Sequence, residues 1–255
     1  MVFCFFICFT ICFFRIEKKK EYIKDEIPSL FVLSLTGFGI CGAFPYISGL
    51  TTTVTNMGII YALSPIIIVI LSAIFFQEKL KFLQLIGISI SFFGVSFVIF
   101  KGELKNLINL IFTYGDLWIF VAAIGWAVFS INLINWKSQF SIFARFALMS
   151  FIGSIIIFPF YLIEEVYFIQ TYFDQKFIFF VLMASIFPGV VAFTMYTKLQ
   201  QLVGASLAGL TVYLMPIYAS IYGMILFGEQ LQIFHFYGAL LVLLGIFLAN
   251  KKYSK

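Results

Sequence analysis

Charged residues are scarce in this chain: they make up 11% of its 255 residues, while 63% are hydrophobic. A soluble domain has about 25% charged residues, so there is too little polar surface here to cover a water-soluble globule. Strict alternation of polar and apolar residues is also lacking, which argues against a membrane β-barrel. The apolar residues come instead in blocks of about 20, the length that a helix needs to cross a bilayer. The sequence therefore predicts an all-α, multi-pass integral membrane protein.

Patterns typical of catalysis or metal binding are lacking as well. There is one His, and no Asp, Glu, Lys or Arg lies in the middle of a predicted span. Cys4, Cys8 and Cys12 would share a helix face but extend over about 12 Å, too far for one metal ion. We therefore expect no enzyme activity, no cofactor and no metal. The net charge of +5 is interpreted through membrane topology, and we expect no nucleic-acid partner.

An internal repeat organises the chain. A 32-residue stretch that begins at Leu63 returns 151 positions later, with ten identical positions and no gap. Residue types that are rare in this stretch occupy equivalent positions in the two copies, because Pro65 matches Pro216 and Glu78 matches Glu229. Two Gly match as well. A repeat of this kind in a hydrophobic chain indicates a duplicated membrane protein.

The apolar blocks predict eight complete spans and a shortened helix over residues 1–14. The complete spans are expected at about 28–48, 53–76, 83–100, 116–135, 142–163, 177–197, 204–227 and 233–250. The repeat offset places the counterpart of one block before Met1. It therefore predicts ten spans in the parent fold, with one helix and part of a second missing from this N-terminus. Gly87 and Gly94, seven residues apart near one helix face, would let a neighbouring helix approach closely.

The two halves of the chain are predicted to be inverted five-helix repeats. An odd number of helices makes the second repeat enter the membrane from the opposite side, so equivalent loops should differ in basic residues. They do, since Lys79 and Lys81 correspond to Gln230 and Gln232. The expected organisation is an incomplete first repeat over 1–101, a linker over 102–114, a second repeat over 115–250 and a tail over 251–255.

Basic residues also predict the orientation. Cytoplasmic loops carry an excess of Lys and Arg. If the charged loop at 15–24 is cytoplasmic, 13 of the 16 Lys and Arg fall inside, and only Lys101, Lys105 and Lys176 fall outside. We therefore expect a cytoplasmic C-terminus, most naturally in a bacterial cytoplasmic (inner) membrane.

The combined pattern resembles the EamA-type permeases of the drug/metabolite transporter superfamily. It consists of an apolar run, a Pro, a Glu about a dozen residues later and a helix with two Gly, present twice over about residues 28–250. Gly115-Asp116, followed by Ile124-Gly125-Trp126-Ala127, is similar to the start of that family's second repeat. The resemblance implies a ten-helix carrier with a central cavity between its repeats, alternating access and both termini in the cytoplasm. It implies small metabolites, often amino acids or their derivatives, as substrates.

Uncharged polar residues are the candidates for the substrate cavity, because carrier sites lie near the bilayer midplane at the repeat interface. Trp126 and Asn132 are the preferred pair, since they lie well inside a span. Each candidate hydroxyl could instead bond to its own helix backbone, and Trp or Tyr could anchor the protein at the interface. The full set is Thr52, Thr55, Asn56, Trp126, Ser130, Asn132, Tyr196, Thr211 and Tyr213.

Two Pro–Glu pairs are the candidates for hinge or gating residues. Pro65 and Pro216 each remove a backbone hydrogen bond, so they mark either a static kink or a hinge. Glu78 and Glu229 either tether short loops or act in gating. The expected function is a secondary transporter for a small polar metabolite, in a lipid bilayer and with a homodimer left open. A non-functional remnant of a transporter gene and, less favoured, a membrane-embedded enzyme remain as alternatives.

Overall fold

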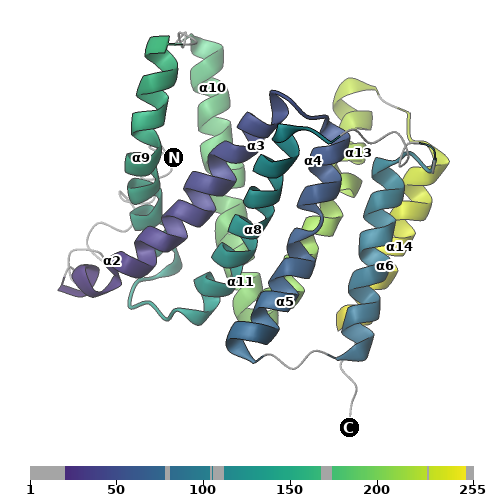
Figure 1. Cartoon of the computed structure of the whole chain (residues 1–255), viewed down its shortest axis with the longest axis horizontal. Coiled ribbons are helices and arrows are strands. Elements are labelled where there is room, and N and C mark those ends of the chain that lie inside the picture. The colour runs from purple at the N-terminus through teal and green to yellow at the C-terminus, as the bar shows by residue number, and fades with distance from the viewer. Residues whose placement is uncertain are drawn as a thin grey trace. The chain divides into compact units, whose positions relative to one another are not determined.

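The computed structural model describes residues 21–77, 81–103, 105, 112–167, 174–228 and 230–250 (Figure 1). Within these ranges the structure is built from helices and contains no strands. The elements are α2 (Glu21–Ser34), η1 (Leu35–Ile40), α3 (Cys41–Gly49), α4 (Val54–Tyr61), α5 (Ser64–Phe76), α6 (Phe82–Ile99), α8 (Tyr114–Asn135), α9 (Ile142–Tyr167), α10 (Gln175–Ala184), η2 (Ser185–Val191), α11 (Ala192–Val203), α12 (Ala205–Gly209), η3 (Leu210–Leu214), α13 (Met215–Phe227) and α14 (Ile233–Asn250).

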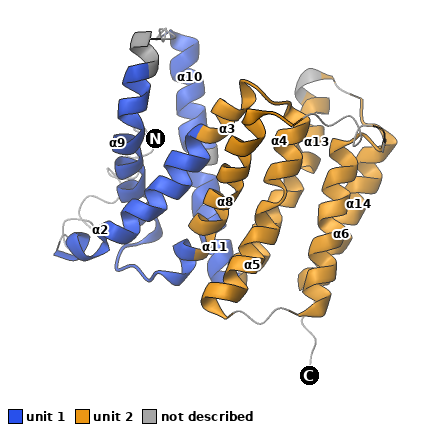
Figure 2. Ribbon diagram, in the orientation of Figure 1, with its two compact units in different colours: residues 1–43, 132–202 blue, residues 44–131, 203–255 orange. Residues whose placement is uncertain are grey.

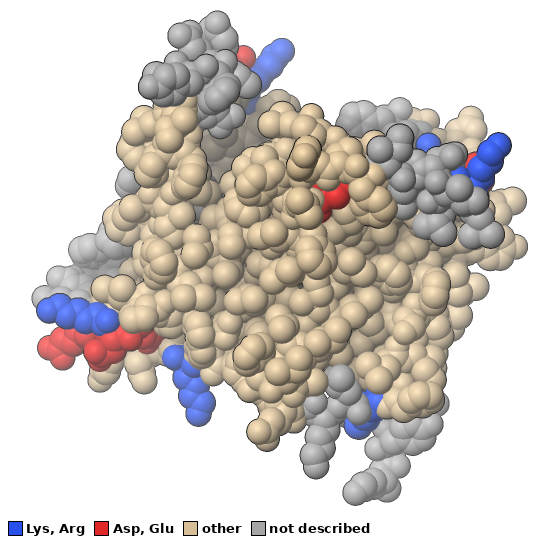
Figure 3. Space-filling view, in the orientation of Figure 1, with Lys and Arg blue, Asp and Glu red and all other residues tan. Residues whose placement is uncertain are grey.

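Among the described residues, eight helices are long and apolar enough to cross a membrane. Their limits agree with the predicted spans within two residues, except that the first span begins at Glu21, seven residues early, and the sixth ends at Val203, six residues late. The all-α membrane fold is confirmed. Large apolar side chains such as Phe236 and Phe247 are about two-thirds exposed, as expected of surface that faces lipid rather than water. In Figure 3 most of the visible face is uncharged, and the charged atoms lie mainly toward its margins. The shortened helix at 1–14 and both Glu78 and Glu229 lie outside the described residues.

The chain forms two compact units, and each draws on both halves of the sequence (Figure 2). Unit 1 contains residues 1–43 and 132–202, and unit 2 contains residues 44–131 and 203–255. In unit 1, α2 and η1 pack against α9. The core of unit 1 includes Phe146, whose ring lies 4.3 Å from that of Phe193 and 5.6 Å from that of Phe38.

Unit 2 is built around a close crossing of α6 and α14. A Cβ added to Gly87 would lie 2.4 Å from the Gly245 carbonyl oxygen, and one added to Gly94 would lie 2.9 Å from that of Gly238. Small residues let the two backbones approach this closely. The earlier Gly of each helix meets the later Gly of the other, so α6 and α14 run antiparallel. The predicted close-packing role of Gly87 and Gly94 is therefore confirmed.

Equivalent positions of the repeat face each other at this crossing. Ser91 Oγ donates a hydrogen bond to the Val242 carbonyl oxygen at 3.2 Å, and these residues are 151 positions apart. An antiparallel crossing that pairs equivalent positions is what a two-fold axis in the membrane plane produces. The contact geometry of α6 and α14 therefore has the symmetry of an inverted repeat.

The two Pro-containing spans are broken at equivalent places. Pro65 lies in the first turn of α5 and Pro216 in the first turn of α13, where a missing N–H costs nothing because no carbonyl lies four residues back within the helix. Each of these helices then ends at a left-handed residue, Gln77 (φ 52°) or Gly228 (φ 68°), and these are again equivalent in the repeat. The sequence repeat is therefore reproduced in local backbone geometry.

A second pair of spans carries matched π-helical turns. η1 covers Leu35–Ile40, whose counterparts are residues 186–191, and η2 covers Ser185–Val191. A π-helical turn inserts one extra residue into an α-helix and is frequent at functional sites. Sequence periodicity does not reveal such an insertion, because every residue of these segments is apolar or small.

Candidate functional site

A buried carboxylate is the centre of one polar cluster in unit 2. Asp116, in the first turn of α8, is 6% exposed. Its Oδ1 accepts hydrogen bonds from Thr52 Oγ1 at 2.5 Å and Asn56 Nδ2 at 3.1 Å. Its Oδ2 accepts from the Thr113 backbone N–H at 2.6 Å and from Asn56 Nδ2 at 3.2 Å. Four donor contacts on one carboxylate stabilise its charged form and tie the start of α8 to the start of α4.

Thr52 and Asn56, two of the predicted cavity residues, are thus brought together by a carboxylate at the end of a predicted span. The backbone of α8 also approaches the end of α3 closely here, since a Cβ on Gly115 would lie 2.6 Å from the Ser48 carbonyl oxygen. The α4 helix begins just after Thr53, which caps it by accepting from the Asn56 N–H at 3.2 Å. The side chains of Thr52 and Asn56 are therefore committed to hydrogen bonds with Asp116.

The predicted residues of α8 lie on different faces of that helix. Ser130 follows Trp126 by four residues and so lies near the same face, while Asn132 lies about 120° away around the helix. Ser130 is fully buried, and Trp126 is half-buried with its ring 5.5 Å from that of Phe129. The preferred pair, Trp126 and Asn132, therefore does not present one continuous surface.

The remaining predicted cavity residues occupy varied surroundings. Thr211 Oγ1 donates to the Ala208 carbonyl oxygen at 2.8 Å, which is the local backbone bond weighed as its alternative role. Tyr213 is fully buried in the core of unit 2. Tyr196 in α11 and Thr55 in α4 are both half-buried.

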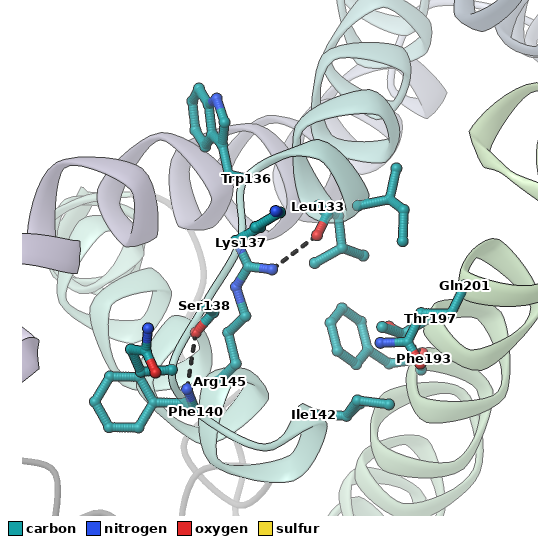
Figure 4. Close-up of a pocket in the computed structure, with 12 residues that line it drawn as sticks. Leu133, Trp136, Lys137, Ser138, Phe140, Ile142, Arg145, Phe193, Thr197 and Gln201 are labelled. Atoms are coloured by element: carbon teal, nitrogen blue, oxygen red, sulfur yellow. Dashed lines mark hydrogen bonds between the residues drawn. The ribbon is translucent and has the colours of Figure 1, made fainter.

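Unit 1 contains a cavity that the sequence did not indicate. It has a volume of about 380 Å³ and lies beside the turn that joins α8 to α9, with α11 along its other side (Figure 4). Arg145 lines it, and Nη1 of that side chain donates to the Leu133 carbonyl oxygen at 2.7 Å. Glu26, from α2, accepts from Ser138 Oγ at 2.6 Å and from the Gln139 N–H at 2.7 Å. The turn is thus held from both sides.

Arg145 and Glu26 were missed because both lie near predicted span ends, where charge is ordinary. Arg145 was counted among the cytoplasmic loop charges, although it is the fourth residue of the span at 142–163. A cation inside an apolar span is costly unless it has a partner. The position of Arg145 inside an apolar span was therefore the feature of the sequence that could have indicated a buried, partnered cation. Across the described part of the chain, no group of three or more His, Cys, Asp and Glu could hold a metal ion.

Comparison with known proteins identifies relatives over most of the chain. A family model described as "EamA-like transporter family" matches residues 1–100 and 113–251. The chain is 29% identical over 242 residues to the "Uncharacterized transporter YetK" of Bacillus subtilis, covering 92% of this chain and 71% of that protein. It is 26% identical to the "Uncharacterized transporter YoaV" of the same organism, covering 97% and 83%. A crystal structure with 15% identity superposes with a TM-score of 0.72 over 88% of this chain and 76% of that one.

Proposed function

Since the chain belongs to the EamA-like transporter family, we propose that it moves a small polar metabolite, such as an amino acid or a derivative, by alternating access. The observation that carries this proposal is the antiparallel α6–α14 crossing, in which Gly87 meets Gly245 and Gly94 meets Gly238. Inverted repeats related in this way support alternating access, because the two halves can exchange conformations around one central site. Multi-pass integration in a lipid bilayer follows from the eight apolar helices and the family.

The proposed orientation places the C-terminus in the cytoplasm of a bacterial inner membrane. Its support is the uneven distribution of Lys and Arg. The proposed hinges are Pro65 and Pro216, supported by the break that each marks in its span. Each proline lies in the first turn of its helix, directly after a turn at Ala62–Leu63 or after the 3₁₀-helix η3, so bending there breaks few α-helical hydrogen bonds.

A transport assay tests the proposed function. Membrane vesicles that contain the protein, and matched vesicles without it, are incubated with radiolabelled amino acids and related metabolites. We expect saturable uptake of at least one compound only in vesicles that contain the protein. The proposal fails if well-folded protein moves none of the panel above the control.

The proposed cavity residues can be tested in the same assay. Trp126→Ala and Asn132→Ala remove the two side chains that we favour for substrate contact, and Leu243→Ala, an exposed position of α14, is the matched control. If the two residues contact substrate, we expect each site variant to lower transport at least about tenfold, the loss of roughly one good hydrogen bond or stacking contact. Unchanged transport in both site variants, at equal protein level, would refute the assignment.

A further inference from the structure

The π-helical turns η1 and η2 close with the same hydrogen bond. At the end of η1 the N–H of Cys41 donates to the Thr36 carbonyl oxygen, five residues back. At the end of η2 the N–H of Ala192 donates to the carbonyl oxygens of Phe187 and Gly189, of which Phe187 again lies five residues back. Cys41 and Ala192 are 151 positions apart, as are Thr36 and Phe187. The two turns therefore end at equivalent places in the repeat.

A serine hydroxyl marks the start of each turn. Ser34 Oγ donates to the Leu30 carbonyl oxygen at 2.6 Å, and Ser185 Oγ donates to the Val181 carbonyl oxygen at 2.7 Å. These two bonds keep the same 151-residue offset. A hydroxyl that bonds back to a carbonyl four residues earlier often bends its helix and slightly destabilises it. The helix is thus weakened at the same place in both halves of the chain.

The two turns are built from different residues. Gly37 and Gly39 of η1 correspond to Pro188 and Val190 of η2, so no shared helix breaker produces the irregularity. π-helical bonding is rare, and it occurs mostly as single turns at functional sites. An irregular turn that both copies form from different residues indicates that its backbone shape has a role.

Aromatic rings connect the two turns inside unit 1 (Figure 2). Phe38 belongs to η1, and Phe193 is the second residue after η2. Their rings lie 6.4 Å apart, and the ring of Phe146 in α9 lies 5.6 Å from the first and 4.3 Å from the second. Val190 of η2 is buried in the same core. Because rings at such separations pack directly, a rotation of the helix at η1 displaces side chains beside η2.

We propose, resting on the transport function proposed above, that η1 and η2 are a coupled pair of hinges. At these turns α2–α3 and α10–α11 change direction together during alternating access. Exchanging five-residue for four-residue hydrogen bonds turns the helix beyond the hinge by about 100°, the rotation per residue of an α-helix. Only one turn of bonds is exchanged, so the rest of each span moves as a rigid rod. These hinges lie in other spans than Pro65 and Pro216 and add to them.

Removing one residue from a π-helical turn tests its role. Deletion of Gly37 from η1, or of Gly189 from η2, takes away the extra residue and leaves a continuous α-helix with its present faces at both ends. Neither Gly has a side chain whose packing would be lost, so we expect an unchanged unfolding temperature. Deletion of Gly153 from the regular helix α9 is the matched control. It turns the rest of α9 by about 100° and should lower the unfolding temperature strongly.

Amide hydrogen exchange, followed by mass spectrometry on the purified full-length protein in detergent, detects the hinges without any substrate. We expect the amides of η1 and η2 to exchange at least about tenfold faster than those of α9, because local opening there breaks few bonds. Deletion of Gly37 should slow exchange at least about threefold in η2 as well as in η1 if the two turns open together. Deletion of Gly189 should have the reciprocal effect on η1.

The aromatic rings are tested by a second pair of variants. Phe38→Leu removes a half-buried ring that contacts both Phe146 and Phe193. Phe151→Leu makes the same change at an exposed position of α9 and is the matched control. We expect the effect of the Gly37 deletion on η2 to disappear in the presence of Phe38→Leu and to persist in the presence of Phe151→Leu.

Transport gives an additional readout once a transported compound is known. We expect each glycine deletion in η1 or η2 to slow transport at least about tenfold at an unchanged unfolding temperature, because loss of a hinge slows the conformational step. Transport at the unaltered rate in both deletion variants would overturn the proposal.

The exchange measurements overturn the proposal if η1 and η2 exchange as slowly as α9, or if neither deletion affects the other turn. If one deletion variant does not fold, the other decides. If neither folds, the turns are needed by the folded structure itself, and the hinge proposal is wrong. Absence of transport for every compound tested would count against the proposed function but leave the exchange results unaffected, so the two proposals are judged separately.

Discussion

At the scale of single residues, Asp116 shows how a charge at a span end becomes structural. Its two oxygens accept from Thr52, Asn56 and the Thr113 backbone, so one side chain orders the entry to α4 and the first turn of α8. Thr52 and Asn56 were selected from the sequence as polar groups near the start of a span. Their position in the span predicts their depth in the membrane. Depth alone does not reveal which acceptor a side chain reaches.

Replacing Asp116 is predicted to destabilise unit 2. In Asp116→Asn, one carboxylate oxygen becomes an NH₂ that faces donors, so we expect a loss of about 2–3 kcal/mol from unsatisfied buried groups. The control is Asp174→Asn, at the N-cap of α10, where Asp174 accepts from the Phe177 N–H. Asn caps a helix about as well as Asp, so that variant should unfold near the original temperature. Equal unfolding temperatures for both variants, measured in detergent, would contradict the role given to Asp116.

At the scale of elements, the matched breaks in the two halves of the chain are the main finding. α5 and α13 each begin at a Pro-containing first turn and end at a left-handed residue, and η1 and η2 fall at equivalent positions. The α6–α14 crossing depends on residues without side chains.

The glycine crossing is predicted to tolerate no added methyl group. In Gly87→Ala the new Cβ would lie 2.4 Å from the Gly245 carbonyl oxygen, so α6 and α14 must move apart, and overpacking of this kind costs about 1–3 kcal/mol. Gly42→Ala is the control, because its nearest neighbour would be an Ile157 side-chain carbon at 3.9 Å. That control should be neutral or slightly more stable, since Ala favours helices. Thermal unfolding of the two variants side by side checks this, and an unaffected Gly87→Ala would refute the close crossing.

The broken spans are predicted to matter for motion more than for stability. Pro65→Ala adds a backbone N–H to the first turn of α5 and removes the proline ring. An unbroken α-helix can then run from α4 into α5. If the break serves as a hinge, we expect transport to slow several-fold while the unfolding temperature changes little, because Ala also suits a helix start. Pro159→Ala, inside α9, is the comparison for a Pro at which we propose no hinge. Transport that falls only in step with stability would favour a static kink.

At the scale of the whole molecule, the orientation in the membrane is the property that the distribution of basic residues predicts. Single Cys residues placed at Lys176 and Lys198 of a variant without other Cys test it with a membrane-impermeant maleimide. We expect labelling of Lys176→Cys in intact cells and of Lys198→Cys only after permeabilisation, since Lys176 is one of three basic residues predicted outside. The opposite pattern would invert the topology and with it the predicted cytoplasmic C-terminus.

Sequence alone was sufficient for the class of fold, the eight spans and the duplication. These properties follow from local features: the length of each apolar block, and rare residues such as Pro65 and Pro216 that keep their spacing. The role of Gly87 and Gly94 could also be predicted, because small residues on one face of a membrane helix have few other uses.

Only the tertiary structure decided which polar groups meet. Asp116 accepts hydrogen bonds from Thr52 and Asn56, which lie about 60 residues earlier in the chain. Glu26 accepts one from a turn more than 100 residues later. Arg145 has the position of an ordinary loop charge in the sequence, whereas in the structure its side chain is buried and donates to the Leu133 carbonyl oxygen. The physical reason is that the contribution of a buried polar group to stability depends on whether it has a hydrogen-bond partner. Partners that are distant in the chain are brought together by packing, and local spacing in the sequence does not reveal them.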